Sequence, residues 1–411
     1  MGEVARLKRS PAAMLDVAVI GGGIVGTAAA ATLAAAGARV TLYETGPAVA
    51  AAASGRNAGE ICHPPDPVLG RLYHESLDRY RALAGELVGP GATFRVPAAP
   101  IGVLDVAFDG DLVRRVAASL AAAQPDLCPE VVDGAALSGL EPLLADGLTA
   151  FRLETGYPIR PADATRAFAA FAQRHGAVIW ASARAHPWIE RGVTLGVEVS
   201  GRKVAAGYVI VAAGPWTPEL VDPSDHWRPI RPVWGVIVEM DLVPAPRHVV
   251  GELRDEGSLL LAGPSRATNA PSVEANGDLP LPILGVNPGP LPAGGGVAST
   301  ALGGTLAPVE PDAHRVAPTL VEHAHRFLPS IHAGQMGAVR ACARPQSADG
   351  RPLIGFVAGI ERLVVAAGNG AWGISTGPAT ARLDADAVLA GTDAGVPPEL
   401  LARRFGGVGG S

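Results

Sequence analysis

Residues 16–44 read DVAVIGGGIVGTAAAATLAAAGARVTLYE, and this stretch decides the fold. A β-branched apolar run precedes three glycines, an alanine-rich segment follows and ends at Gly37, and a second apolar run ends at Glu44. This order predicts a strand, a tight turn, a helix and a second strand. A βαβ unit of about 30 residues is typical of proteins with a parallel sheet.

The turn in this unit has the pattern Gly21-x-Gly23-x-x-Gly26. Glycines allow the tight turn and let the backbone approach a pyrophosphate, while the helix N-terminus offers free N–H groups and positive dipole. Glu44 can accept both hydroxyls of an adenosine ribose, which disfavours the 2′-phosphate of NADP. The pattern therefore predicts a dinucleotide, and NAD and FAD both remain open.

Composition sets the broad class of the protein. The 411 residues contain 33 Lys+Arg and 39 Asp+Glu, a net charge of −6 that argues against a nucleic-acid partner. With 48% hydrophobic and 18% charged residues the chain is not disordered and is long enough for two domains. The cysteines Cys62, Cys128 and Cys342 are too scattered for a disulfide framework or a thiolate zinc site, so we expect a cytoplasmic protein.

The uncharged stretch 17–38 could suggest a membrane span or a signal peptide, but its glycine triplet and alanine-rich run favour a strand, a turn and a buried helix. Further along, apolar spacing predicts helices at 68–88, 160–175 and about 316–327. Residues 92–110 alternate as strands do, and 241–300, rich in proline and glycine, show no regular pattern. We expect no membrane span.

Five segments together indicate a family. They are GGGIVG at 21–26, SGRNAGEI at 54–61, VIVAAGPWTPEL at 209–220, ARPQSADGRPLIG at 343–355 and AAGNGAWGISTGPAT at 366–380. With these segments in this order, the chain resembles the FAD-dependent D-amino acid oxidase superfamily, especially its branch of glycine oxidases, sarcosine oxidases and D-amino acid dehydrogenases. The resemblance favours FAD over NAD as the cofactor.

The resemblance implies an α/β fold with two domains. A Rossmann-like FAD-binding domain, discontinuous in sequence, would be joined to an α+β substrate domain built on a mostly antiparallel sheet. Glycine-containing turns near the two ends of the chain would then close around one FAD. The expected boundaries are 15–80, 150–222 and 336–400 for the FAD-binding domain, 81–149 and 223–335 for the substrate domain, and 1–14 and 404–411 for tails.

The resemblance also implies which residues contact the cofactor. The Ser54 hydroxyl would lie on the pyrophosphate, and the helix after the last glycine turn would stabilise negative charge on reduced flavin. Cys342 has the spacing to Asp349 of the cysteine that holds covalent flavin in sarcosine oxidases, but its CARP surroundings follow the noncovalent branch, so we expect noncovalent FAD. The expected cofactor-binding residues are Gly21, Gly23, Ile24, Val25, Gly26, Glu44, Ser54, Arg56, Asn57, Ala58, Gly59, Ala213, Gly214, Trp216, Gly370, Gly373, Ile374, Ser375 and Thr376.

Arg344 matches the arginine of the glycine oxidase-like branch and is the expected ligand of a substrate carboxylate, which a planar guanidinium can bind through two parallel hydrogen bonds. A structural ion pair is the alternative. Arg340, four residues earlier, departs from the aromatic residue often found there. The other candidates for the substrate pocket, each of which could instead be a core or surface residue, are His63, Tyr157, Trp234 and Trp372.

The reaction implied is oxidation of the C–N bond of a small amine or amino acid, with hydride transfer to flavin N5 and hydrolysis of the resulting imine. Oxygen or another acceptor would then take the electrons. Sarcosine oxidases use a lysine to promote the reaction with oxygen, and Lys203 is the last lysine of this chain. The alternatives are a noncatalytic flavin subunit of a larger complex, a redirected flavin oxidoreductase of secondary metabolism and an NAD-linked dehydrogenase. Neither the oligomeric state nor the stereochemical preference follows from the sequence.

Overall fold

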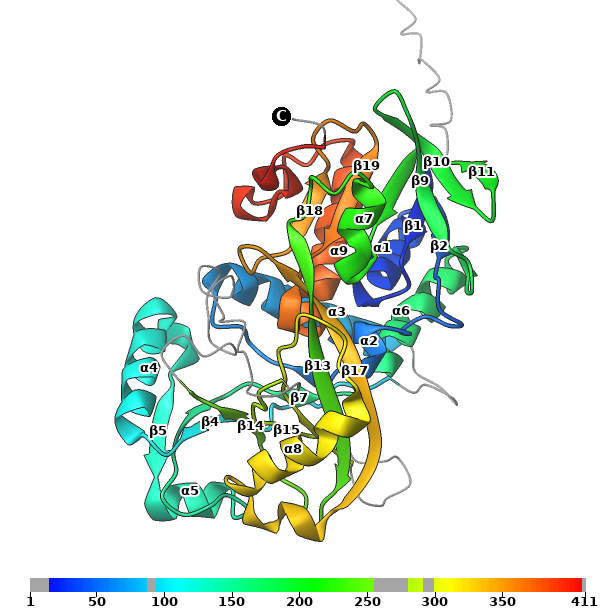
Figure 1. The fold of residues 1–411 in the computed structure, drawn as a ribbon. Coiled ribbons are helices and arrows are strands. Elements are labelled where there is room, and N and C mark those ends of the chain that lie inside the picture. Colours follow the sequence, from blue (N-terminus) through cyan, green and yellow to red (C-terminus); the bar gives the residue numbers. More distant parts are fainter. Residues whose placement is uncertain (1–14, 87–93, 255–279, 291–298, 409–411) are drawn as a thin grey trace, which may run out of the picture.

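The computed structural model describes residues 15–86, 94–254, 280–290 and 299–408, so the predicted tail at 1–14 lies outside the described residues. A six-stranded sheet organises one end of the molecule (Figure 1). Its strands are parallel apart from the edge strand Leu353–Phe356, which runs antiparallel to its neighbour. In spatial order they are β18 (Leu353–Phe356), β19 (Leu363–Ala367), β12 (Tyr208–Val211), β1 (Asp16–Ile20), β2 (Arg39–Tyr43) and β8 (Val178–Trp180).

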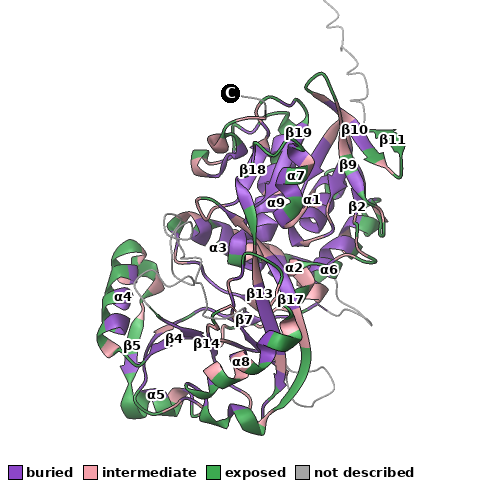
Figure 2. Cartoon of the chain, viewed as in Figure 1, coloured by how far each residue is buried: buried purple, intermediate pink, exposed green. Residues whose placement is uncertain are grey.

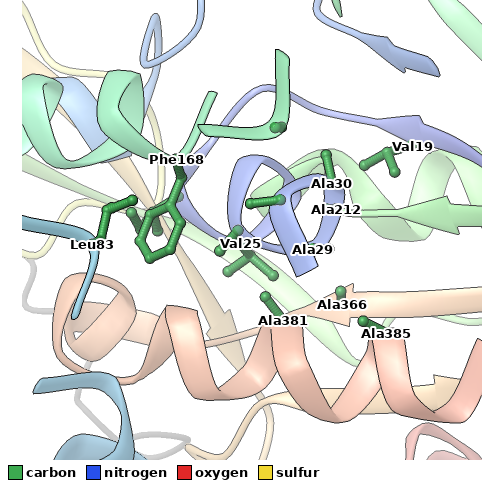
Figure 3. Packing of buried hydrophobic residues seen from close by; sticks show 14 of the residues in the cluster. Val19, Val25, Ala29, Ala30, Leu83, Phe168, Ala212, Ala366, Ala381 and Ala385 are labelled. Atoms are coloured by element: carbon green, nitrogen blue, oxygen red, sulfur yellow. The ribbon is translucent and has the colours of Figure 1, made fainter. Parts of the chain in front are cut away.

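The predicted βαβ unit is confirmed by β1, α1 (Ile24–Ala35) and the parallel strand β2. Alanine dominates α1, and its small side chains let the helix pack closely against neighbours on several sides (Figure 3). Ala29 and Ala30 are fully buried in a cluster that also contains Phe168 and Ala381. Two helices pack directly against α1, α6 (Pro161–Arg174) and α9 (Gly373–Ala390), and α3 (Pro67–Glu86) packs against both of them.

An eight-stranded, mostly antiparallel sheet organises the other end of the molecule. Its long strands β13 and β17 run between the two halves (Figure 1). One pair of strands, β4 and β14, is parallel. In spatial order the strands are β17 (Gln335–Ser347), β13 (Ile230–Asp241), β16 (Thr300–Gly303), β15 (Gly285–Pro288), β14 (Val249–Glu252), β4 (Val103–Ala107), β6 (Thr149–Leu153) and β5 (Glu130–Asp133).

The two faces of this sheet have different surroundings. Leu104 and Val106 point to the face that α8 (Ala313–His325) covers, and the outer side of α8 is exposed (Figure 2). Val103 and Asp105, which alternate with them along β4, point to the opposite face. The sheet therefore has one face packed against a helix and one face free to line a site.

The helices predicted at 68–88 and 160–175 are confirmed by α3 and α6. The helix expected at 316–327 begins earlier, because Asp312 accepts the N–H groups of His314 and Arg315 and caps α8. Within 94–110 only β4 is a strand, since Pro97 and Pro100 cannot donate to a sheet.

The division into domains remains a proposal. β6 and β17 belong to the eight-stranded sheet, although the expected FAD-binding domain includes 150–222 and 336–400. Residues 404–408, expected as part of a tail, pack on the six-stranded half through Phe405 and Val408. Within the described residues, we find no helix long and apolar enough to cross a bilayer. The remaining elements are α2 (Ala53–Arg56), β3 (Glu60–Ile61), α4 (Gly110–Ala123), α5 (Gly134–Leu140), β7 (Tyr157–Pro158), β9 (Ala185–Glu190), β10 (Val193–Val199), β11 (Arg202–Ala205) and α7 (Thr217–Val221).

Candidate cofactor and active site

A cavity of about 2260 Å³ lies between the two sheets. Gly23 before α1 and Gly373 at the start of α9 both line it, and Arg344 lines it from β17. Ordinary small-ligand pockets measure about 300–1,000 Å³. The two glycine-containing turns thus meet at one cavity, as predicted, and the cavity is large enough for a dinucleotide together with a second ligand.

The first glycine turn is tight enough to exclude side chains. Gly21 has φ +114°, and a Cβ placed on it would lie 2.4 Å from the Ala212 carbonyl oxygen. A Cβ on Gly26 would lie 2.0 Å from the Gly21 carbonyl oxygen. The turn therefore keeps a bare backbone at the N-terminus of α1, the arrangement that binds phosphate groups.

Two side chains fix this turn from neighbouring segments. The Glu44 carboxylate, at the end of β2, accepts the Gly22 N–H at 2.6 Å. The Ser54 hydroxyl accepts the Ile24 N–H at 2.9 Å. Both residues also line the cavity. That Glu44 binds ribose hydroxyls and Ser54 a pyrophosphate stays a prediction.

The second glycine turn leads into α9, whose first N–H groups have no side-chain cap. Asn369 donates from Nδ2 to the hydroxyls of Thr376 and Thr380 at 3.0 and 2.9 Å, and Tyr80 donates to the Ile374 carbonyl at 2.9 Å. These bonds fix the start of the helix while its positive dipole end faces the cavity. Such an end can stabilise negative charge on a bound cofactor.

Most of the expected cofactor residues line the cavity, and two lie behind its wall. Gly26 packs against the turn itself, and the Thr376 hydroxyl donates to the Trp372 carbonyl at 2.8 Å. The residues that line it are Gly21, Gly23, Ile24, Val25, Glu44, Ser54, Arg56, Asn57, Ala58, Gly59, Ala213, Gly214, Trp216, Gly370, Gly373, Ile374 and Ser375.

Arg344 extends over the backbone of the neighbouring strand. A Cβ on Gly235 would lie 2.4 Å from the Arg344 Nη2 atom, so a side chain there would displace the guanidinium from its present position. Nη1 donates to the Thr305 carbonyl at 3.0 Å. No acidic side chain among the described residues forms an ion pair with Arg344. The structural ion pair, the alternative role for this residue, is therefore not observed.

Arg340 has a different environment. Its guanidinium pairs with Glu239 and donates to the carbonyls of Arg56 and Asn57, both at 3.0 Å. The residue thereby ties β17 to the C-terminal end of α2. Its contacts indicate a positioning role for the cofactor loop rather than a contact with substrate.

The other pocket candidates divide between the cavity and the core. Trp234, Trp372 and His63 line the cavity, whereas Tyr157 packs in the core around α1 and does not line it. His63 is buried, and burial lowers its pKa to about 4, although a hydrogen bond to the Pro64 carbonyl opposes the shift. His63 is therefore uncharged at neutral pH.

Sequence reasoning missed four polar residues that line the cavity. Glu60, Cys62 and Asp105 lie close enough to affect one another's pKa, and Asn287 lines the cavity from β15. Burial raises the pKa of Glu60 to about 7, and burial together with the Glu60 charge raises the pKa of Asp105 to about 7. Burial also raises the pKa of the Cys62 thiol. An aspartate within the apolar strand VLDVA was the available signal, because buried carboxylates are rare without a partner.

Two further residues bear on the flavin chemistry. Cys342 is a buried free thiol that lines the cavity and lies opposite Gly235, so covalent attachment stays an open alternative. Lys203 lies on β11, forms an ion pair with Glu190 at 3.0 Å and is not a cavity residue. Among the described residues, no lysine lines the cavity.

The residues present fit an FAD molecule. The turn at 21–26 excludes side chains where a pyrophosphate would lie, Glu44 suits a ribose, and the uncapped start of α9 suits a flavin ring that becomes negative on reduction. These groups would hold FAD in the cavity.

Comparison with known proteins agrees with this fit. A family model described as DAO, FAD dependent oxidoreductase, matches residues 16–387. Glycine oxidase from Bacillus licheniformis is 26% identical over 390 residues, which cover 91% of this chain and 93% of that protein. The match to the family model therefore includes both glycine turns and Arg344.

Solved structures show a similar fold. Glycine oxidase from Bacillus cereus ATCC 14579 superposes with a TM-score of 0.71 at 23% identity, over 92% of this chain and 96% of that one. L-proline dehydrogenase from P. horikoshii superposes with a TM-score of 0.74 at 18% identity, over 95% and 96%. With the family model matching nearly the whole chain, the protein belongs to the DAO family of FAD-dependent oxidoreductases.

Proposed function

We propose that the protein oxidises a C–N bond of a small amino acid or of another amine that carries a carboxylate. The observation that carries this proposal is Arg344: a guanidinium without an acidic partner among the described residues shares one cavity with the cradle for FAD. FAD bound there supplies a two-electron acceptor. The names of the similar proteins, which include glycine oxidase and iminodiacetate oxidase, support the same substrate class.

The protein's own residues would contribute binding and orientation. Arg344 would hold the substrate carboxylate through two parallel hydrogen bonds and so fix the adjacent C–N bond relative to the cofactor. His63, with its lowered pKa, is a poor proton acceptor at neutral pH. Trp234 and Trp372 would exclude water from the bound amine. The oxidised product would be an imine, which water hydrolyses.

An anaerobic screen tests the proposal. The purified holoenzyme is mixed with small amines, N-methyl amino acids, both enantiomers of amino acids and the matching hydroxy acids, and the flavin band is followed. We expect amines with a carboxylate to bleach it. If only hydroxy acids bleach it, the C–N assignment is wrong, and if nothing bleaches it, a noncatalytic flavin subunit is the better description. The rate of colour return after admission of oxygen separates an oxidase from a dehydrogenase.

A further inference from the structure

The Arg344 guanidinium lies against a glycine of the neighbouring strand. Arg344 of β17 is opposite Val233 of β13, and Gly235 is two residues further along β13, on the same face of the sheet. A Cβ on Gly235 would lie 2.4 Å from Nη2, 2.5 Å from Nη1 and 2.6 Å from Cζ of Arg344. The guanidinium itself, rather than the aliphatic part of the side chain, therefore occupies the space that a side chain at Gly235 would take.

A backbone carbonyl fixes the same guanidinium from a third segment of the chain. Arg344 Nη1 donates to the Thr305 carbonyl at 3.0 Å, the one hydrogen bond that the described residues make with this guanidinium. Thr305 is fully buried, and its hydroxyl accepts the Val236 N–H at 3.1 Å and donates to the Trp234 carbonyl at 3.4 Å. Val236 and Trp234 flank Gly235. The residue that holds Nη1 is therefore itself tied to the strand against which the guanidinium lies.

These two contacts leave most of the Arg344 donors available to the cavity. A guanidinium carries five N–H donors in a planar fork, and the Thr305 carbonyl accepts from one of its nitrogens. No acidic side chain in the described part of the chain pairs with the guanidinium. Arg344 lines the cavity, whereas Gly235 is buried and does not line it. A carboxylate that enters from the cavity therefore meets donors whose direction is set by Gly235 and Thr305.

A methyl group at Gly235 would displace the guanidinium without disturbing the sheet. Gly235 has no positive φ, so its backbone suits alanine. The atoms in the way belong to the end of a flexible side chain, and a normal contact distance of about 3.5 Å requires them to move by about 1 Å. A shift of this size is enough to break the 3.0 Å bond to Thr305. The substitution thus separates the position of Arg344 from the stability of the fold.

We propose that Gly235 and Thr305 are positioning residues for substrate binding. The missing side chain at Gly235 and the carbonyl of Thr305 hold the Arg344 guanidinium in the orientation in which its free donors receive the substrate carboxylate. Glycine within a strand weakens the strand and marks places where another group approaches closely, which is the use that Arg344 makes of Gly235. Both residues act through Arg344, so this inference rests on the proposed function for the role of that arginine.

A double-mutant cycle on the holoenzyme tests this role. Gly235→Ala should keep the FAD content and Tm of the wild type, while KM for a carboxylate substrate rises about 10-fold or more. KM for an amine without a carboxylate should not change. When Arg344→Ala is already present, adding Gly235→Ala should change KM less than about 2-fold, because the guanidinium that it displaces is gone. Binding of propanoate, followed through the flavin absorbance, gives the same comparison without turnover.

The matched control is Gly337→Ala. Gly337 belongs to the same pair of strands, and its Cβ would make ordinary contacts, 3.6 Å from the Cβ and the carbonyl oxygen of Glu239. This variant should keep the wild-type KM and the wild-type affinity for propanoate.

Thr305 offers a second pair of variants in case Gly235→Ala does not fold. Thr305→Val removes the hydroxyl that ties this residue to β13 and should raise KM for carboxylate substrates a few-fold. Thr305→Ser keeps the hydroxyl and should restore the wild-type value. Equal KM values for the two variants would reject the positioning role of Thr305.

The outcomes separate this inference from the proposed function. If Arg344→Ala raises KM for carboxylate substrates and Gly235→Ala leaves it unchanged, the positioning role is wrong and the proposed function stands. If neither substitution changes KM or propanoate binding, Arg344 does not bind the carboxylate and both are wrong. The same fold-increase from Gly235→Ala with and without the Arg344 side chain would also overturn the positioning role.

Discussion

The cavity has two walls that differ in composition: the cofactor wall, on the side of the six-stranded sheet, and the substrate wall, on the side of the eight-stranded sheet. On the side of the six-stranded sheet, the site consists of backbone at the turn 21–26 and at the start of α9, and a few short side chains hold that backbone in place. On the side of the eight-stranded sheet, the site consists of side chains, chiefly Arg344 and Asp105, that rise from separate strands. We therefore expect substitutions that fill the glycine turns to weaken cofactor binding. Substitutions that remove a single charge, in contrast, should weaken substrate binding.

The largest effect should follow from closing the first glycine turn. Gly26→Ala places a methyl group where a Cβ would lie 2.0 Å from the Gly21 carbonyl oxygen. The turn must open, and we expect FAD affinity to fall about 100-fold or more, equivalent to about 3 kcal/mol. The FAD-to-protein ratio after purification and titration of apoprotein with FAD measure the loss.

Gly85→Ala is the matched control, because a Cβ at this position in α3 would meet no atom of the described residues within 4 Å. It should retain FAD fully. A Gly26→Ala protein that purifies with one FAD per chain would show that the turn does not have to be tight. The claim that cofactor binding depends on backbone free of side chains would then be wrong.

On the other wall, Arg344→Ala should change substrate kinetics and leave FAD content unchanged. Loss of a sheltered partner for a carboxylate costs about 2–3 kcal/mol, so KM for carboxylate substrates should rise about 30- to 100-fold. An amine without a carboxylate serves as the internal control, since its KM should not move. Steady-state kinetics with both substrates measure these KM values. Equal increases in KM for both substrates would indicate that Arg344 has a structural role.

Arg340 joins the two walls, and its removal should give a smaller effect on the cofactor. Arg340→Met keeps much of the length but loses the donors to the Arg56 and Asn57 carbonyls and the pair with Glu239. We expect FAD to bind about 10-fold more weakly, about 1.4 kcal/mol, because the loop after α2 is less well fixed. Titration of the apoprotein measures this, and an unchanged Kd would mean that the loop is held by other contacts.

The last prediction concerns the pH dependence of stability rather than ligand binding. Burial raises the pKa of Asp105 from its usual 3.8 to about 7, so the folded protein keeps this proton to a higher pH than the unfolded chain does. The free energy of unfolding should therefore decrease as pH rises from about 4 to about 7 and change no further above that range through this group. In Asp105→Asn this contribution is absent. Tm of the variant relative to wild type should rise between pH 5 and pH 8, and a constant difference would place Asp105 in a more polar setting.

The same contrast explains how much can be predicted from the sequence. The βαβ unit and both glycine turns depend on local sequence, because strand, turn and helix follow one another in residues 16–44 and again in 363–390. Their meeting at one cavity follows from the family resemblance. The cofactor wall is therefore largely predictable from the sequence.

The substrate wall is less predictable, because its residues come together only through strand pairing. Asp105, Gly251 and Gly285 lie on three strands whose register no local pattern reveals. Tyr157, by contrast, is expected in the pocket but lies in the core, where it is paired with the buried Ile61 of β3. Register and side-chain direction are the missing information.

The central claim is that the two glycine turns hold the same FAD molecule. A crystal structure of the holoenzyme tests it most directly. We predict one FAD per chain, with its pyrophosphate at the N-terminus of α1 beside Gly23 and its isoalloxazine at the N-terminus of α9 beside Gly373. An FAD molecule that contacts only one of the two turns, or a protein that crystallises with no flavin after saturation with FAD, would contradict the account.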